Sequence, residues 1–275
     1  MAMTASRTAA VLFVGHGTRF PKGRRAFLKT VADAATRLGI RHFEAAFLEF
    51  CPPTVADALQ KLYRSGVREV LIAPLLLFAA GHVKQDLPSE VGRAREACPG
   101  LRVRFAPVFG EDPRLVALAA ERALKAAGRF EAGDALLVVG RGSQDMEAFA
   151  AFRRVAEAIR RTLGVERWGF GMLTGIGPGL EEAAARLWAQ SPRRTVVLPY
   201  LLFEGYLMRK LPERLNQALS ADWASVAIAR PLGPHPLLAS VLADRVRESM
   251  DECTGRRKGR AMPGLPGVHG PWPDP

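Results

Sequence analysis

The sequence predicts an α/β protein built from two similar lobes, each a four-stranded parallel sheet flanked by helices. Short aliphatic runs alternate along the chain with longer segments of helical period. The runs are almost continuously apolar, as expected for strands that helices cover on both faces, and right-handed crossovers then make neighbouring strands parallel. In addition, residues 11–124 recur as residues 136–248, with a shift of 125 residues over most of that length, from 15 to 140 and from 74 to 199.

The two copies match closely along their sequences. Residues 11–18 read VLFVGHGT and residues 136–143 read LLVVGRGS, while PLLLF at 74–78 returns as PYLLF at 199–203. Beyond these segments one residue drops out of the second copy. At 275 residues the chain can hold two modest domains, each with its own apolar core, and the repeat predicts that it does.

In the first copy, strands are expected at the short, mostly apolar runs of residues 10–15, 43–50, 69–77 and 102–108. Helices are expected where apolar residues recur at helical spacing, at residues 21–38, 54–65, 87–97 and 113–127. Pro113 suits the first turn of the last helix, with Asp112 before it as the N-cap. The second copy should repeat this plan.

We therefore expect a functional domain at residues 8–128 and a degenerate repeat of it at residues 133–250. The remaining segment, residues 254–275, is a basic tail that is rich in glycine and proline and poor in aliphatic residues. Such a composition buries too little apolar surface to offset the entropy that is lost on ordering. The tail should therefore be disordered.

The formal net charge of +12 could favour binding of nucleic acid, an anionic membrane or an acidic small molecule. Basic residues in the body of the chain lie mostly along amphipathic helices, which is typical of a solvated face; examples are Arg153, Arg154, Arg160 and Arg161. Basic and aromatic residues are not interleaved, and no known nucleic-acid motif is present. We therefore expect no nucleic-acid partner, while a polyanionic small substrate stays open.

The sequence shows neither a membrane segment nor a framework of cysteines. Its longest apolar stretch, residues 71–80, contains a proline and is too short to cross a bilayer, and the first ten residues lack the pattern of a secretory signal. The cysteines are odd in number, scattered and without a Cys-x-x-Cys pair, at Cys51, Cys98 and Cys253. We expect a cytoplasmic protein with reduced thiols, no membrane partner and no iron–sulfur cluster.

Three residues that can bind a metal or move a proton are present in the first copy and absent from the second. They are His16, Glu49 and His82, and the second copy has Arg141, Thr174 and Tyr206 in their places. His16 follows the first predicted strand, Glu49 lies at the end of the second and His82 lies just past the third, and the carboxyl ends of parallel strands form a ligand crevice. If the first strand lies between the second and the third, these side chains line one edge of a cleft between the lobes, with the second lobe as its other wall.

Two imidazoles and a carboxylate suit several kinds of chemistry. They bind first-row divalent metals and leave coordination positions open for a substrate, and an imidazole exchanges protons near neutral pH. Glu49 stands in an otherwise apolar run, residues 45–51, where an unpaired carboxylate is costly to bury. Gly15, Gly17 and Gly81 would let the backbone approach a bulky ligand. Metal delivery, metal-assisted hydrolysis and proton transfer all fit these residues.

Other motifs carry weaker signals. His42, His235 and His269 have no comparable setting and are expected on the surface or in loops. The segment GIGPG at 175–179 follows a strand and opens a helix, as a phosphate loop does, but it lacks a full Gly-x-Gly-x-x-Gly pattern and a lysine, and its proline removes an amide donor. Ser143 is not framed as Gly-x-Ser-x-Gly, so a nucleophile elbow is not expected.

Three ordered motifs resemble the sirohydrochlorin chelatases of the CbiX and SirB type, which are class II chelatases. They are VGHGT at 14–18, FLEF at 47–50 followed by two prolines, and PLLLF at 74–78 leading into GHVKQDLP at 81–88. The resemblance covers almost the whole chain up to about Met250, and it is to the long, duplicated members in which one half keeps the site. It implies two flavodoxin-like or chelatase-like lobes, with residues 8–128 as the catalytic domain.

The resemblance also implies an activity: insertion of cobalt or ferrous iron into sirohydrochlorin without ATP, in cobalamin or sirohaem biosynthesis. His16, Glu49 and His82 would hold the incoming ion and accept protons from the macrocycle. Because that substrate is a polycarboxylate, cations near the cleft are expected to bind its carboxylates; the candidates are Arg19, Lys84 and Arg141. The sequence does not decide between cobalt and iron, because both metals accept nitrogen and oxygen ligands.

Some long members of the family carry a histidine-rich stretch or cluster-binding cysteines near the C-terminus. This tail offers His269 and the nearby Cys253, so no iron–sulfur cluster is expected here either. The duplication leads us to expect a monomer with pseudo-twofold lobes. A non-catalytic protein that binds a tetrapyrrole or a metal is the alternative function, and another hydrolase or phosphate-binding α/β protein is the third.

Overall fold

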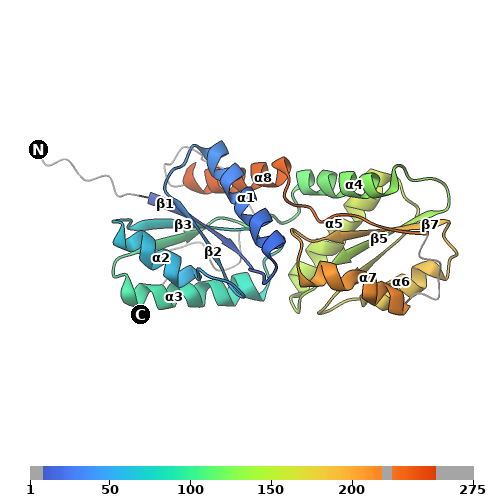
Figure 1. The fold of residues 1–275 in the computed structure, drawn as a ribbon, viewed down its shortest axis with the longest axis horizontal. Helices are drawn as coiled ribbons and strands as arrows, with labels where there is room; N and C mark the ends of the chain where they lie inside the picture. Colours follow the sequence, from blue (N-terminus) through green and yellow to red (C-terminus); the bar gives the residue numbers. More distant parts are fainter. Residues whose placement is uncertain (1–8, 219–224, 252–275) are drawn as a thin grey trace, which may run out of the picture. The chain divides into compact units, whose positions relative to one another are not determined.

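The computed structural model describes residues 9–218 and 225–251, apart from the side chains of His82 and Val83. It has two four-stranded parallel sheets flanked by helices, which confirms the predicted fold class (Figure 1). Cys253, His269 and the tail at 254–275 lie outside the described residues.

The first sheet has the strand order β2-β1-β3-β4. Its strands are β1 (Ala9–Gly15), β2 (Phe43–Phe47), β3 (Glu69–Pro74) and β4 (Arg102–Phe105); the helices of this copy are α1 (Pro21–Leu38), α2 (Val55–Arg64), the π-helix η1 (His82–Asp86), α3 (Leu87–Ala97) and α4 (Pro113–Ala127). Strand β1 pairs in parallel with β2 on one side and with β3 on the other. The flanking arrangement on which the predicted site depends is therefore present.

Two helices of the first copy, α2 and α4, begin directly after a residue whose side chain caps them. The Thr54 hydroxyl accepts a hydrogen bond of 3.1 Å from the amide of Asp57, whose carboxylate accepts one of 3.1 Å from the amide of Thr54. Before α4, the carboxylate of Asp112 accepts a bond of 3.0 Å from the amide of Arg114, with Pro113 in the first turn as predicted. These caps fix the first residues of α2 and α4.

Three predicted strands were too long at their carboxyl ends. The strands expected at 43–50, 69–77 and 102–108 end at Phe47, Pro74 and Phe105. Beyond each end the chain still bonds to the neighbouring strand or its extension, as the amide of Leu75 does to the carbonyl of Val14 at 2.7 Å. An apolar run therefore does not mark where strand pairing stops. The π-helix η1 was not predicted either.

The second sheet repeats the first, with the order β6-β5-β7-β8. Its strands are β5 (Asp134–Gly140), β6 (Arg167–Met172), β7 (Arg194–Tyr200) and β8 (Val226–Ile228), and its helices are α5 (Met146–Leu163), α6 (Leu180–Trp188), α7 (Tyr206–Ala218) and α8 (Pro236–Asp251). Helices α6 and α7 cover one face, where Leu180 and Leu211 pack against Leu137 of β5. The order of elements in the second copy thus follows the prediction.

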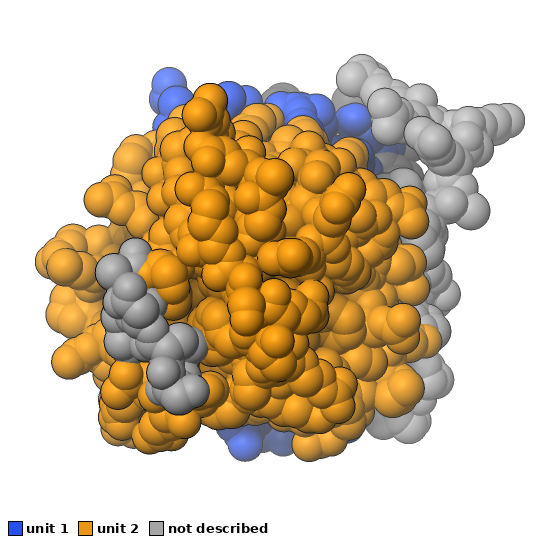
Figure 2. Space-filling view, turned by 90° about the vertical axis from the view of Figure 1, so that its right-hand side faces the viewer, with its two compact units in different colours: residues 1–16, 34–110, 242–275 blue, residues 17–33, 111–241 orange. Residues whose placement is uncertain are grey.

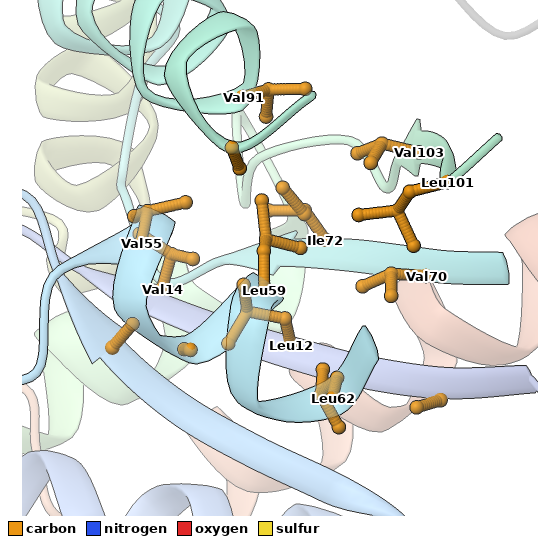
Figure 3. Close-up of a cluster of buried hydrophobic side chains, with 14 of the residues drawn as sticks. Leu12, Val14, Val55, Leu59, Leu62, Val70, Ile72, Val91, Leu101 and Val103 are labelled. Atoms are coloured by element: carbon orange, nitrogen blue, oxygen red, sulfur yellow. The ribbon is translucent and has the colours of Figure 1, made fainter. Parts of the chain in front are cut away.

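Helices α2 and α3 cover one face of the first sheet (Figure 3). Leu12 of β1 and Ile72 of β3 belong to one buried cluster with Leu59 of α2 and Val91 of α3. Burial of a side chain of this size contributes about 1.5–3 kcal/mol. This layer holds β1 and β3 in place, and so fixes the strand ends after which two of the candidate residues follow.

The chain forms two compact units, which Figure 2 colours blue and orange. Unit 1 comprises residues 1–16, 34–110 and 242–275 and contains the first sheet, whereas unit 2 comprises residues 17–33 and 111–241 and contains the second. Helices α1 and α8 each begin in unit 2 and end in unit 1, and α4 lies wholly in unit 2. The borders of the units therefore differ from those of the sequence repeat.

Among the helices of residues 9–218 and 225–251, none combines the length and the apolar character needed to cross a membrane.

Unit 2 contains a buried carboxylate, Asp134, at the start of β5. Its side chain is inaccessible to solvent and forms ion pairs of 2.9 Å with Arg193 and 2.7 Å with Arg194. Burial raises the pKa of this carboxyl, but hydrogen bonds from the amide of Glu131 and from Arg194, with the charges of both arginines, hold the pKa below its ordinary value. The ionised carboxylate is thus stabilised by folding.

We expect Asp134→Asn to destabilise the protein by about 2 kcal/mol at pH 7, because both arginines lose a buried anionic partner. A lowered folded-state pKa gives stability that is present above the unfolded value of about 4 and is lost as the pH falls through the folded value. The difference between variant and wild type in urea denaturation should therefore shrink below about pH 4. An equal difference at pH 7 and pH 3 would contradict this assignment.

Candidate functional site

The candidate site begins where β1 and β2 end side by side. His16 directly follows β1, and Glu49 lies two residues beyond β2. The amide of Glu49 donates a hydrogen bond of 2.9 Å to the carbonyl of His16, and the amide of Leu48 donates one of 3.0 Å to Gly15. Both candidate side chains are half-buried. The structure thus brings two of the three predicted residues together through their backbone.

The third candidate, His82, is the first residue of the π-helix η1, which leads directly into α3. The chain reaches it from the end of β3, the other neighbour of β1. Single turns of π-helix are frequent at functional sites. Among the described side chains, which leave out that of His82, no group of three His, Cys, Asp or Glu residues could hold a metal ion. The meeting of His16, Glu49 and His82 around one ion stays a prediction.

An aromatic residue that the sequence reasoning assigned to a strand lies against His16. The rings of Phe50 and His16 are stacked, with their centroids 5.7 Å apart and their planes 22° from parallel. Phe50 is nevertheless 54% exposed to solvent. The sequence offered one signal for a functional role of Phe50, namely its position directly after Glu49. An apolar residue beside a candidate ligand can pack in the core or contact a substrate.

The backbone at Phe50 is strained. The amide of Cys51 donates a hydrogen bond of 2.8 Å to the carbonyl of Glu49, which closes a three-residue turn with Phe50 at its centre, and the φ angle of Phe50 is +67°. A γ-turn with positive φ is the rarer and strained form. For a side chain with a Cβ atom, the left-handed region costs about 1–2 kcal/mol. The local fold bears this cost at the candidate site.

The second copy keeps the same backbone frame without the same side chains. The carbonyl of Arg141, which matches His16, accepts a bond of 3.0 Å from the amide of Thr174, which matches Glu49. The Thr174 hydroxyl donates to the same carbonyl at 3.0 Å. Tyr206, which matches His82, is the first residue of α7 and is exposed. Both copies therefore share the backbone frame. The side chains that could bind a metal are found in the first copy alone.

Of the predicted carboxylate-binding residues, Lys84 lies in the same unit as His16 and Glu49. It is the third residue of η1 and is exposed. Arg19, before α1, and Arg141, after β5, are exposed residues of unit 2. All three candidates are on the surface, where a carboxylate of a ligand can reach them.

Contacts within the protein account for the glycine-rich loop at 175–179. A Cβ atom on Gly175 would lie 2.3 Å from the carbonyl oxygen of Ser143, and one on Gly177 would lie 2.5 Å from the ring of Phe149. Close packing thus requires glycine at both positions without any phosphate. The Ser143 hydroxyl accepts a bond of 3.0 Å from the amide of Asp145 at the start of α5, which gives it a structural role.

The other described histidines lie outside this site. His42 is exposed just before β2. His235 precedes α8, and its Nδ1 accepts a hydrogen bond of 3.2 Å from the amide of Leu237. Burial lowers the pKa of His235, so this ring acts as a neutral cap for the helix. Neither histidine competes with His16 as a metal ligand.

Comparison with known proteins gives consistent matches over both copies. A family model described as CbiX matches the chain twice, at residues 10–126 and 135–249. The sirohydrochlorin ferrochelatase of Priestia megaterium is 31% identical over 238 residues, which cover 86% of this chain and 89% of that protein. A sirohydrochlorin cobaltochelatase of the same species is 26% identical over 250 residues, covering 88% of this chain and 80% of that protein.

A solved structure has the same fold over nearly the whole chain. SirB from Bacillus subtilis, solved with Fe3+, superposes with a TM-score of 0.76 at 25% sequence identity, covering 90% of this chain and 98% of that one.

Proposed function

The chain belongs to the CbiX family, and on that premise we propose that it inserts Co2+ or Fe2+ into sirohydrochlorin, without ATP, in cobalamin or sirohaem biosynthesis. Membership of this family makes it a metal chelatase. The metal ion is therefore a substrate, and the macrocycle is its acceptor. We take the protein to be a cytoplasmic monomer that needs neither nucleic acid, a membrane nor an iron–sulfur cluster.

One observation supports the site above all others: the hydrogen bond of 2.9 Å that joins Glu49 to His16 where β2 and β1 end. His82 follows β3 in the chain, and β3 is the other neighbour of β1, which supports a site at this edge of the sheet. The second copy has the same bond between Thr174 and Arg141. We propose that residues 8–128 form the catalytic domain and residues 133–250 its degenerate repeat.

These side chains suit the steps that metal insertion requires. A divalent ion must exchange its water for ring nitrogens, and two N–H protons must leave the macrocycle for each ion that enters it. Imidazole nitrogens and a carboxylate bind such ions and leave coordination positions open. His16 and His82 would present the ion, while Glu49 would offset its charge and, with an imidazole, accept protons.

The substrate's carboxylates need cationic partners outside the metal site. We propose Lys84, Arg19 and Arg141 for this role, because all three are exposed and positively charged. A guanidinium binds a carboxylate through two hydrogen bonds, whereas an ammonium acts as a point charge.

The direct test is an anaerobic assay of the purified protein with sirohydrochlorin and either Co2+ or Fe2+, followed by the absorbance change of the macrocycle. We expect metallated product in excess of the protein, without ATP. Product that stops at one equivalent per chain would instead indicate a non-catalytic protein that binds the tetrapyrrole or the metal. The ratio of the two initial rates would show which metal is preferred.

A further inference from the structure

Phe50 and Gly175 occupy matching positions in the two copies, and both have a positive φ angle. Their φ angles are +67° and +78°. In both copies the loop is closed at its base by the same kind of bridge, between Phe47 and Thr54 in the first and between Met172 and Gly179 in the second. Glycine is the residue that this conformation favours. The first copy nevertheless has a bulky aromatic residue there.

Phe50 does not belong to the buried apolar core of the first copy. The residue is 54% exposed, so it contributes less to the core than a buried ring would. In the second copy the backbone of Ser143 fills the space beside Gly175. In the first, that position carries an aromatic ring that is open to solvent on part of its surface and stacked on His16 on another.

We infer that Phe50 binds the macrocycle, as an apolar platform that holds the tetrapyrrole beside the imidazole of His16. This role rests on the proposed function. An exposed aromatic ring stacks favourably on a flat conjugated ligand. Because Phe50 is already stacked on His16, a macrocycle that contacts Phe50 lies next to a residue that presents the ion. The strained turn keeps the ring at this place.

Phe50→Gly is the sharpest test, since the second copy has a glycine with a positive φ angle at the matching position. We expect it to raise both the Kd for metal-free sirohydrochlorin, measured by fluorescence titration, and the KM for insertion by about tenfold. The Kd for Co2+ alone, measured by calorimetry, should stay within about twofold, and the thermal midpoint should be unchanged or higher, because the strain is relieved.

Two further variants separate binding from a general loss of apolar surface. Phe50→Tyr keeps the ring and should bind the macrocycle nearly as wild type does. Leu124→Ala removes an apolar side chain of α4 that is 41% exposed, and it should change neither constant.

The role of Phe50 is refuted if the macrocycle's Kd in Phe50→Gly stays within about twofold of wild type, or if it rises only together with a lower thermal midpoint. Wild-type protein in the same assay separates the two claims. Insertion by the wild type with an unchanged Kd in the variant refutes the platform alone, whereas no insertion by the wild type refutes the proposed function.

Discussion

His16→Ala is expected to abolish metal insertion, lowering the rate by at least about a thousandfold, while the protein stays folded. The change removes one of the two imidazoles that present the ion. Its cost to folding is small, since His16 is a half-buried loop residue whose ring contacts that of Phe50, and such a contact contributes about 0.5–1.5 kcal/mol. Initial rates with Co2+ and Fe2+, together with circular dichroism and a thermal melt, would measure both effects.

Arg141→Ala is the matched comparison in the second copy, because Arg141 occupies the same place in the repeated frame. Its loss should mainly raise KM, because the substrate's carboxylates are bound more weakly, and should affect kcat much less. If both variants lost activity equally, residues of both copies would take part in catalysis. That result would contradict the hypothesis of a single site in the first copy.

The parts of the fold that follow from local sequence were predicted well. Helices α1, α3 and α4 have the predicted bounds, and prolines mark the first turn of each, because proline suits that turn and breaks a helix elsewhere. The strands were less accurate at their carboxyl ends, since apolar residues continue past the last pairing. That error hid the turn at Phe50, although its alignment with Gly175 pointed to a positive φ angle.

The division into units could not be predicted from local sequence. It depends on contacts between residues far apart in the chain, such as the bond of 2.8 Å that Arg122 of α4 donates to the carbonyl of Leu232, 110 residues later. A repeat in the sequence shows that two segments share a fold, but it does not show on which sheet their terminal helices pack. Helix α4 belongs to the first copy in sequence and to unit 2 in space.

Glu49→Gln should lower the rate of insertion by about a hundredfold to a thousandfold, the second large effect that we expect. The amide side chain has nearly the same size, and the hydrogen bond to His16 comes from the backbone of Glu49, so the loop keeps its frame. What disappears is the negative charge that offsets the ion and the group that accepts a proton. The Kd for Co2+ and the rate of insertion should therefore both become worse.

The control for Glu49→Gln lies at the matching position. Thr174→Val removes the bond from the Thr174 hydroxyl to the carbonyl of Arg141 and should cost about 1 kcal/mol of stability or less, with activity near that of wild type. Full activity in Glu49→Gln would exclude its charge from the reaction. If Glu49→Gln were fully active and His16→Ala inactive, the imidazoles would be the groups that both hold the ion and remove the protons.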